Sequence, residues 1–178
     1  MIPEIRPASA ADAPAIARVR REVWFAAYSE IIDPAIIARV TVDRGGAETP
    51  PAYRTSLVAA GPPDGEILGY ASYGPERAMD GSGGSASLTP AGLAGETGEL
   101  YAIYVASAAW STGAGRALMD AALGGLRAAG FRRVVLWTLR DNARARRFYD
   151  KAGLAPDGAT NILTGLGGIE ELRYARAL

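Results

Sequence analysis

The sequence predicts a mixed α/β protein in which helices cover both faces of one sheet. Three observations lead to this fold class. Apolar residues recur at helical spacing in the segment after Asp12, two short strand-like runs flank a turn-forming segment at 61–65, and residues 99–154 alternate between strand and helix patterns. The length of 178 residues suits one domain, 1–178, that buries a core without disulfides or metals.

The N-terminal part predicts a strand and two helices. The strand covers residues 2–6. Ser9, with Asp12 three residues later, resembles a capping box that begins a helix. A short helix is expected over residues 34–40, after which residues 43–53 give little signal.

A hairpin and a long loop are expected next. Residues 56–60 and 66–74 favour strands, and the Gly- and Pro-rich run between them favours a turn, so the two strands should pair. Residues 75–98 are rich in Gly, Ser, Ala and Pro and lack a period, which predicts a mobile loop.

The C-terminal half predicts a βαβ unit, another helix and a closing strand. Residues 99–105 and 134–139 are expected to be strands, joined by a helix over 114–129 through a right-handed crossover. Asp141 is expected to cap the following helix. The closing strand is expected over 169–177.

Composition limits the available chemistry. The chain has no Cys and no His, which excludes thiolate nucleophiles, Ser-His-Asp triads and His-based metal sites, so no metal is expected. Nineteen basic residues balance 19 acidic ones, and this balance argues against nucleic acid or a membrane surface as a partner. With no leader pattern and no long apolar run, a cytoplasmic location is expected.

A glycine-spaced turn predicts an anion site. It lies between a predicted strand and the helix that follows, where unpaired N–H groups and the helix dipole favour a phosphate. A dinucleotide fingerprint is excluded because Leu118 replaces its third glycine, and a P-loop is excluded because no Lys follows. The amides expected to face the anion belong to Ser111, Thr112, Gly113, Ala114, Gly115 and Arg116.

Two motifs together resemble the GNAT superfamily of acyl-CoA-dependent N-acyltransferases. One is a strand ending in Val, followed by [QR]-x-x-G-x-[GA] and a helix, and it matches at Val105, Gly113 and Gly115. The other is N-x-x-A-x-x-F-Y-x-x-x-G-[FL], which is matched by Asn142, Ala145, Phe148, Tyr149, Gly153 and Leu154. The resemblance implies a mostly antiparallel twisted sheet, helices on both faces and a central βαβ unit that binds acetyl-CoA.

The resemblance also implies roles for particular residues. The pyrophosphate would lie against the glycine turn, and the pantetheine would run along the backbone of Ile103, Tyr104 and Val105 like an added strand. Asn142 would hydrogen-bond the cofactor or the substrate near the thioester. Trp110 stands where the pattern has Gln or Arg, which removes one possible donor to the cofactor.

Direct transfer to an amine is the implied reaction. Tyr149 is expected to protonate the departing sulfur, since a phenol is protonated at neutral pH; the alternative is a core aromatic beside Phe148. Glu99 is the leading candidate for the base, directly or through water, and the alternative is an exposed charge at a strand end. Glu66 and Glu96 are weaker candidates, and Trp137 either lines the channel or fills the core.

The acceptor is left open. Trp24, Tyr28 and Glu30 are candidates for an aromatic, acidic pocket that receives a small-molecule amine or a peptide N-terminus, together with a loop at 160–168. The alternative is that Trp24 and Tyr28, one helical turn apart, pack on the sheet. A homodimer is compatible with the sequence. The alternative function is an acyl-CoA-binding sensor with little turnover.

Overall fold

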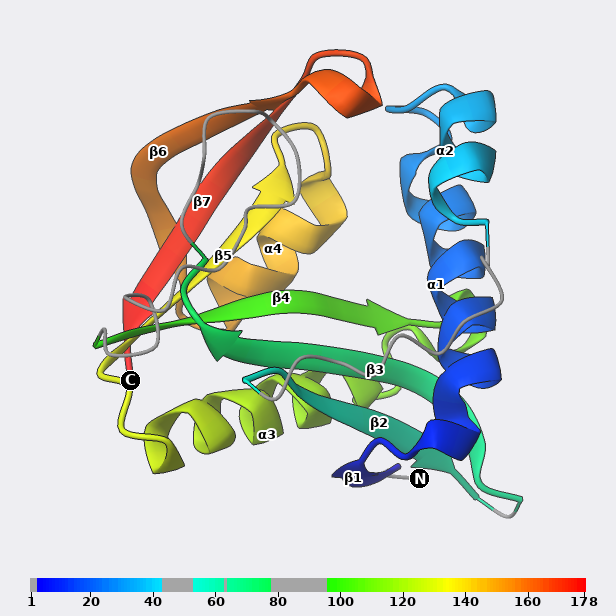
Figure 1. Ribbon diagram of the computed structural model, residues 1–178, viewed down its shortest axis with the longest axis vertical. Helices are drawn as coiled ribbons and strands as arrows, with labels where there is room; N and C mark the ends of the chain where they lie inside the picture. Colours follow the sequence, from blue (N-terminus) through cyan, green and yellow to red (C-terminus); the bar gives the residue numbers. More distant parts are fainter. Residues whose placement is uncertain (1–2, 43–52, 63, 78–95) are drawn as a thin grey trace.

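The computed structural model describes residues 3–42, 53–62, 64–77 and 96–178, and its centre is a seven-stranded sheet in the order β1-β2-β3-β4-β5-β7-β6 (Figure 1). The strands are β1 (Glu4–Pro7), β2 (Thr55–Gly61), β3 (Glu66–Pro75), β4 (Thr97–Val105), β5 (Arg133–Leu139), β6 (Ala155–Leu163) and β7 (Ile169–Ala177). The helices are α1 (Ala13–Tyr28), α2 (Pro34–Val40), α3 (Ala114–Ala128) and α4 (Ala143–Lys151).

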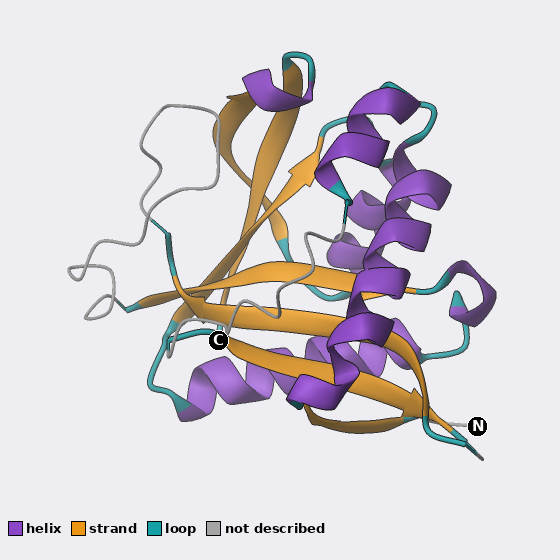
Figure 2. Ribbon diagram, turned by 45° about the vertical axis from the view of Figure 1, so that its right-hand side comes forward, coloured by secondary structure: helices purple, strands orange, loops and turns teal. Residues whose placement is uncertain are grey.

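Helices cover both faces of the sheet, as the sequence predicts. Figures 1 and 2 show α1 and α3 on opposite sides of β2, β3 and β4. Buried side chains of α3 such as Leu118 and Leu126 pack with Ala71 and Leu100 in the larger core cluster. Val19 and Val23 of α1 form a second cluster on the other face, with Val58 and Tyr70 among its members.

The capping box expected at Ser9 is present. The carboxylate of Asp12 accepts hydrogen bonds from the backbone N–H of Ser9 at 2.7 Å and from its hydroxyl at 2.8 Å. Arg6, at the end of β1, donates two further hydrogen bonds to the same carboxylate, at 2.7 and 2.8 Å. One buried side chain therefore fixes the connection from β1 into α1.

The sheet opens between its two central strands. β4 and β5 form the parallel pair within the described sheet, and they pair only at Thr97, Gly98 and Glu99 before they diverge. β4 carries a bulge at this point, because Ser72 faces Ala102 while Tyr73 faces Leu100, which leaves Tyr101 without a partner on β3. The bulge bends β4 away from β5. On the edge of β4 that faces β5, the main chain beyond Glu99 has no strand beside it, while the other edge stays paired with β3 as far as Val105.

Three expectations from the sequence need correction or fall outside the described part. Asn142, and not Asp141, caps α4, because its side chain reaches the Ala145 N–H. Residues 160–168 are not all loop: β6 continues to Leu163, and a short 3-10 turn leads into β7. Most of the loop expected at 75–98 lies outside the described residues. Among those that are described, no helix is both long enough and apolar enough to cross a bilayer.

Candidate active site

The divergence of β4 from β5 opens a cavity of about 830 Å³, within the usual range for a site that holds a small ligand or a cofactor. Its walls come from α1, the second half of β4, the start of α3, β5 and α4. Among the residues expected at the site, those that line it are Tyr28, Ile103, Tyr104, Val105, Ser111, Gly113, Gly115, Arg116, Asn142 and Tyr149.

One end of the cavity is the turn before α3. Ser111 and Gly113 both have positive φ angles, 64° and 101°, so the chain turns sharply over a few residues. The hydroxyl of Thr112 donates to the carbonyl of Ala109 at 2.8 Å and holds this turn. The carbonyl of Gly113 accepts from Ala117, and the N–H groups of the first helical turn therefore have no intrahelical acceptor. These amides form a nest suited to an anion.

Trp110 joins this turn to two other elements. Its indole Nε1–H donates to the carbonyl of Val105 at 2.7 Å, at the end of β4. The guanidinium carbon of Arg144, in the first turn of α4, lies 3.8 Å from the centre of the Trp110 ring. Trp110 therefore does not leave a gap where the sequence pattern has Gln or Arg, and it connects β4 to α4 across the cavity wall.

Asn142 lies at the start of α4 and is 7% exposed. Its Oδ1 accepts a hydrogen bond from the Ala145 N–H at 3.0 Å, which caps the helix and fixes the orientation of the amide. Because Oδ1 is occupied, Nδ2 is the group that Asn142 directs to its other neighbours. Interaction with Asn142 acts to lower the pKa of Tyr28, although burial outweighs it and raises that pKa well above its ordinary value.

Tyr149 projects from α4 into the interior. It is 8% exposed and packs against Phe148 and Tyr174 with ring centres 5.5 and 5.9 Å away. Burial, with a smaller contribution from Tyr104, raises the pKa of Tyr149 well above that of a free phenol. The hydroxyl therefore keeps its proton across the neutral and mildly alkaline range.

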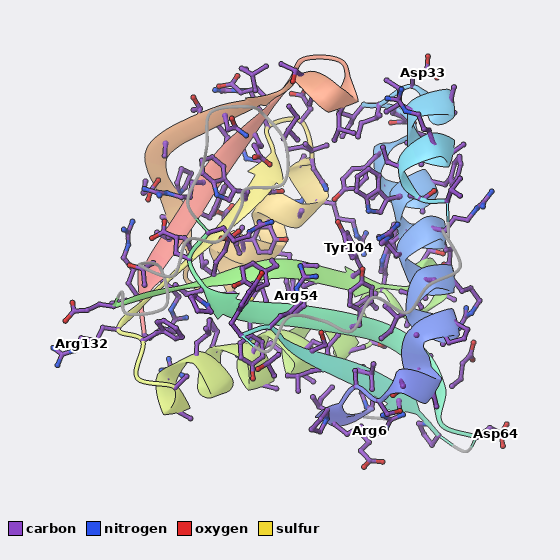
Figure 3. All side chains as sticks on the ribbon, in the orientation of Figure 1. Arg6, Asp33, Arg54, Asp64, Tyr104 and Arg132 are labelled. Atoms are coloured by element: carbon purple, nitrogen blue, oxygen red, sulfur yellow. The ribbon has the colours of Figure 1, made fainter. Side chains whose placement is uncertain are left out.

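Aromatic side chains form the wall nearest α1. Tyr104 projects from β4 toward α1 (Figure 3), and burial raises the pKa of its hydroxyl. Tyr28 lines the same part of the cavity and meets Trp24 edge to face, with ring centres 5.3 Å apart. The Trp24 indole N–H is buried and makes no hydrogen bond within the described residues. Glu30 is exposed and does not line the cavity.

Glu99 is buried and already paired. It is 1% exposed, and its two carboxylate oxygens accept hydrogen bonds from Arg77: Oε2 from the backbone N–H at 2.9 Å and Oε1 from Nε at 3.0 Å and from the terminal guanidinium. The ring of Tyr101, which lines the cavity, lies 4.9 Å from the same guanidinium. Glu99 is therefore next to the cavity wall and not part of it. The other two candidate bases, Glu66 and Glu96, are exposed and paired with Arg18 and Arg132.

The basic residues of α4 divide into two groups. Arg144, Arg147 and Lys151 line the cavity. Arg146 faces away from it and donates to the Tyr174 hydroxyl at 3.1 Å and to the carbonyl of Arg140 at 3.1 Å. Only part of this charged helix therefore contributes positive potential to the site.

Several residues that line the cavity were not expected there from the sequence, among them Tyr101, Thr138 and Arg176. Tyr101 lines the cavity at the bulge of β4, and no local sequence pattern predicts that bulge. Thr138 follows Trp137 on β5. The sequence predicts β5 as a continuous apolar run, and such a run does not indicate which of its residues face the cavity. Trp137 itself lines the cavity and is half-buried, in agreement with the first of its two predicted roles.

The fold and the cavity together indicate the family to which this chain belongs. β4 and β5 diverge next to the start of α3, whose free N–H groups can bind a phosphate. The protonated Tyr149 lies deeper in the same cavity. This arrangement suits an extended ligand that carries phosphates at one end and reacts at the other. The model of the acetyltransferase (GNAT) family matches residues 16–154, and the chain belongs to this family.

The chain is also similar to individual proteins named as acetyltransferases. A mycothiol acetyltransferase of Beutenbergia cavernae is 48% identical over 60 residues, which are 34% of this chain and 20% of that protein, so the match spans about a fifth of the relative. A probable N-acetyltransferase of Mycobacterium tuberculosis is 26% identical over 93% of this chain and 87% of its own. The PaiA N-acetyltransferase of Thermoplasma acidophilum, solved in complex with coenzyme A, is similar in fold with a TM-score of 0.68, 17% identity, and coverage of 97% of this chain and 98% of its own.

Proposed function

We propose that this protein transfers the acetyl group of acetyl-CoA directly to a primary amine of a small molecule or a peptide, with both substrates bound together. The observation that carries this proposal is the cavity between the diverging β4 and β5. It connects the amide nest before α3 with Asn142 and Tyr149, so one extended thioester can reach both ends.

The residues present suit this cofactor. The amides of Ser111, Thr112, Gly113, Ala114, Gly115 and Arg116 would receive the pyrophosphate. A Cβ added at Gly113 would meet no atom within 4 Å, which means that open space lies beside this backbone. The main chain of Ile103 and Tyr104, on the edge of β4 that faces β5, would bind the pantetheine amides, whereas the Val105 carbonyl already accepts a hydrogen bond from Trp110.

The chain supplies a proton donor and hydrogen-bond donors to the transfer. Bound acetyl-CoA offers a thioester whose carbonyl carbon bonds to the amine nitrogen while the carbon–sulfur bond breaks. Tyr149 donates its phenolic proton to the leaving sulfur, and the raised pKa of Tyr149 keeps that proton available. A backbone N–H of β4 stabilises the developing oxyanion, because the edge of β4 that faces β5 is unpaired beyond Glu99. As the amide forms, the nitrogen loses one proton to a base and finally to solvent, and Tyr149 regains a proton from solvent.

Glu99 is proposed to accept the amine proton through water. Its contacts with Arg77 occupy both oxygens and it does not line the cavity, which argues against direct contact with the amine. Tyr101 lies between this ion pair and the cavity, so a water beside Tyr101 is the shortest connection that the geometry supports.

The acceptor is proposed to enter along the aromatic wall. Tyr28 and Tyr104 line it, and Trp24 supports Tyr28 from behind. Glu30 was a candidate for an acidic contact with a cationic amine, and its exposed position outside the cavity gives that role no support. The aromatic contacts favour acceptors with an apolar body.

The test is acetyl-CoA-dependent release of free thiol against a panel of small amines and peptides, after calorimetry has established CoA binding. We expect release with one class of amine, acetylation of that amine by mass spectrometry, and no thiol release without it. Tight CoA binding without release across a broad panel would instead support a sensor, and absence of CoA binding would overturn the proposal.

A further inference from the structure

We propose that Arg144, held on the face of Trp110, is the residue that selects a donor carrying phosphates over a phosphate-free thioester, and that Trp110 is its positioning residue. This inference rests on the proposed function, because it concerns the same cavity. It starts from the contact that joins the loop before α3 to the first turn of α4.

The contact is close and its platform is fixed. The Arg144 guanidinium carbon lies 3.8 Å from the centre of the Trp110 ring, well inside the usual limit for a cation above an aromatic face. The ring is held in turn by the 2.7 Å hydrogen bond from its Nε1–H to Val105. A planar guanidinium stacked on a fixed ring loses less freedom when it binds a ligand than a free side chain does.

Arg144 also keeps its charge available. Several arginines of the described chain are neutralised by carboxylates, such as Arg116 by Asp120 and Arg140 by Glu170. Arg144 forms no ion pair with any described residue, and its only described side-chain contact is the neutral Trp110 ring. Stacking occupies the face of the guanidinium and leaves its N–H edges free for hydrogen bonds.

Arg144 and the amide nest lie on the same cavity. Arg144 lines it from α4, while Ser111 and Gly113 line it from the turn next to Trp110. Both features favour an anion, and together they suit the diphosphate of a nucleotide-linked thioester better than its uncharged arm. In this chain the cationic side chain is therefore Arg144 of α4. Trp110, at the position where the family pattern has Gln or Arg, provides the aromatic ring on which it stacks.

The experiment compares two donors, acetyl-CoA and the phosphate-free S-acetyl-N-acetylcysteamine. CoA affinity is measured by calorimetry, and kcat/KM is measured for both donors at two salt concentrations. For Arg144→Gln we expect CoA affinity and kcat/KM for acetyl-CoA to fall about tenfold, the usual scale for one charge-assisted hydrogen bond. The kcat/KM for the short thioester should stay unchanged, and the salt dependence of CoA binding should weaken.

Further variants separate charge from position. Arg144→Lys keeps the charge but lacks the planar stack, and Trp110→Leu removes the platform; both should lose several-fold in CoA affinity with kcat retained. Trp110→Phe keeps a ring and should retain most of the affinity. The control is Arg132→Gln, because Arg132 projects into solvent at the far end of the sheet from α1 (Figure 3) and is 81% exposed.

Two results would overturn the inference. The first is that Arg144→Gln binds CoA as tightly as the wild type, and the second is that it loses activity equally with both donors. Either result, with normal CoA binding by the wild type, would leave the proposed function standing. A wild-type protein that fails to bind CoA would overturn the proposed function itself.

Discussion

Asn142 accepts a hydrogen bond from the backbone N–H of Ala145 through Oδ1, at 3.0 Å, and so its side chain caps α4 at the wall of the cavity. Oδ1 stabilises the start of the helix, and Nδ2 is the group proposed to donate to the ligand. A change that separates these two groups can test each role.

Asn142→Asp should separate these two roles. Asp caps helices about as well as Asn, so thermal stability should change little, whereas the loss of the Nδ2 donor should weaken acetyl-CoA binding about tenfold. Asn142→Ala should show the same binding loss and in addition lose about 1 kcal/mol of unfolding free energy. Calorimetry and urea unfolding measure the two effects. Wild-type CoA affinity in Asn142→Asp would remove the amide from the binding site.

Tyr149→Phe should leave CoA affinity unchanged and lower kcat about a hundredfold, in the range usual for the loss of a general acid. The raised pKa of Tyr149 means that its acid form persists as the pH rises, so kcat should show no decline below about pH 10 that is due to this phenol. The matched control is Tyr174→Phe, which removes a neighbouring buried hydroxyl that bonds to Arg146 outside the cavity. Similar losses in both variants would point to packing and not to proton donation.

Local sequence signals were sufficient for much of the fold. α2 and β7 have the bounds that were predicted, because Asp33 caps α2 before Pro34 and a strand pattern closes the chain. The motif residues Gly113, Gly115, Asn142 and Tyr149 all line one cavity, and the roles that the resemblance implies for them stay predictions.

The features that the sequence did not predict depend on contacts between distant segments. β6 was missed because Pro156 and Gly158 interrupt its pattern and most of its residues are exposed; its pairing with β7 defines it. The bond between Arg77 and Glu99 spans 22 positions, and no local period signals it. The stack of Arg144 on Trp110 joins two motifs that are separate in sequence.

Gly113→Val should abolish measurable CoA binding, because its side chain would enter the open space beside the amide nest. The backbone φ of +101° also makes this change strained, so a matched control is needed. Gly130→Val supplies it: Gly130 has φ of +92°, ends α3 and does not line the cavity. Both variants should lose stability to a similar extent. CoA affinity that falls equally in the two would show that strain, and not position, is the cause.

Asp12→Ala should lower the unfolding free energy at neutral pH by about 1 kcal/mol, the usual value for a lost capping interaction. The hydrogen bonds from Arg6 and Ser9 hold the pKa of Asp12 below its ordinary value, although burial opposes them. The contribution of the carboxylate is therefore complete above about pH 4 and declines as the pH falls through the lowered pKa. Urea unfolding at several pH values should show the two proteins converging in acid. A difference that persists unchanged down to pH 2 would exclude the charged form as its source.

Glu99→Gln tests whether this buried carboxylate moves a proton or only holds Arg77. If water connects Glu99 to the amine, the variant should lose about a hundredfold in kcat and keep its affinity for CoA. Arg77→Lys is the matched control, since it keeps the carboxylate, a cation and the backbone contact but loses the two guanidinium contacts with Oε1, and it should lose much less activity. Thermal unfolding of both variants reports on the ion pair itself. Equal losses of activity and of melting temperature in the two would make Glu99 a structural partner of Arg77 and leave solvent as the proton acceptor.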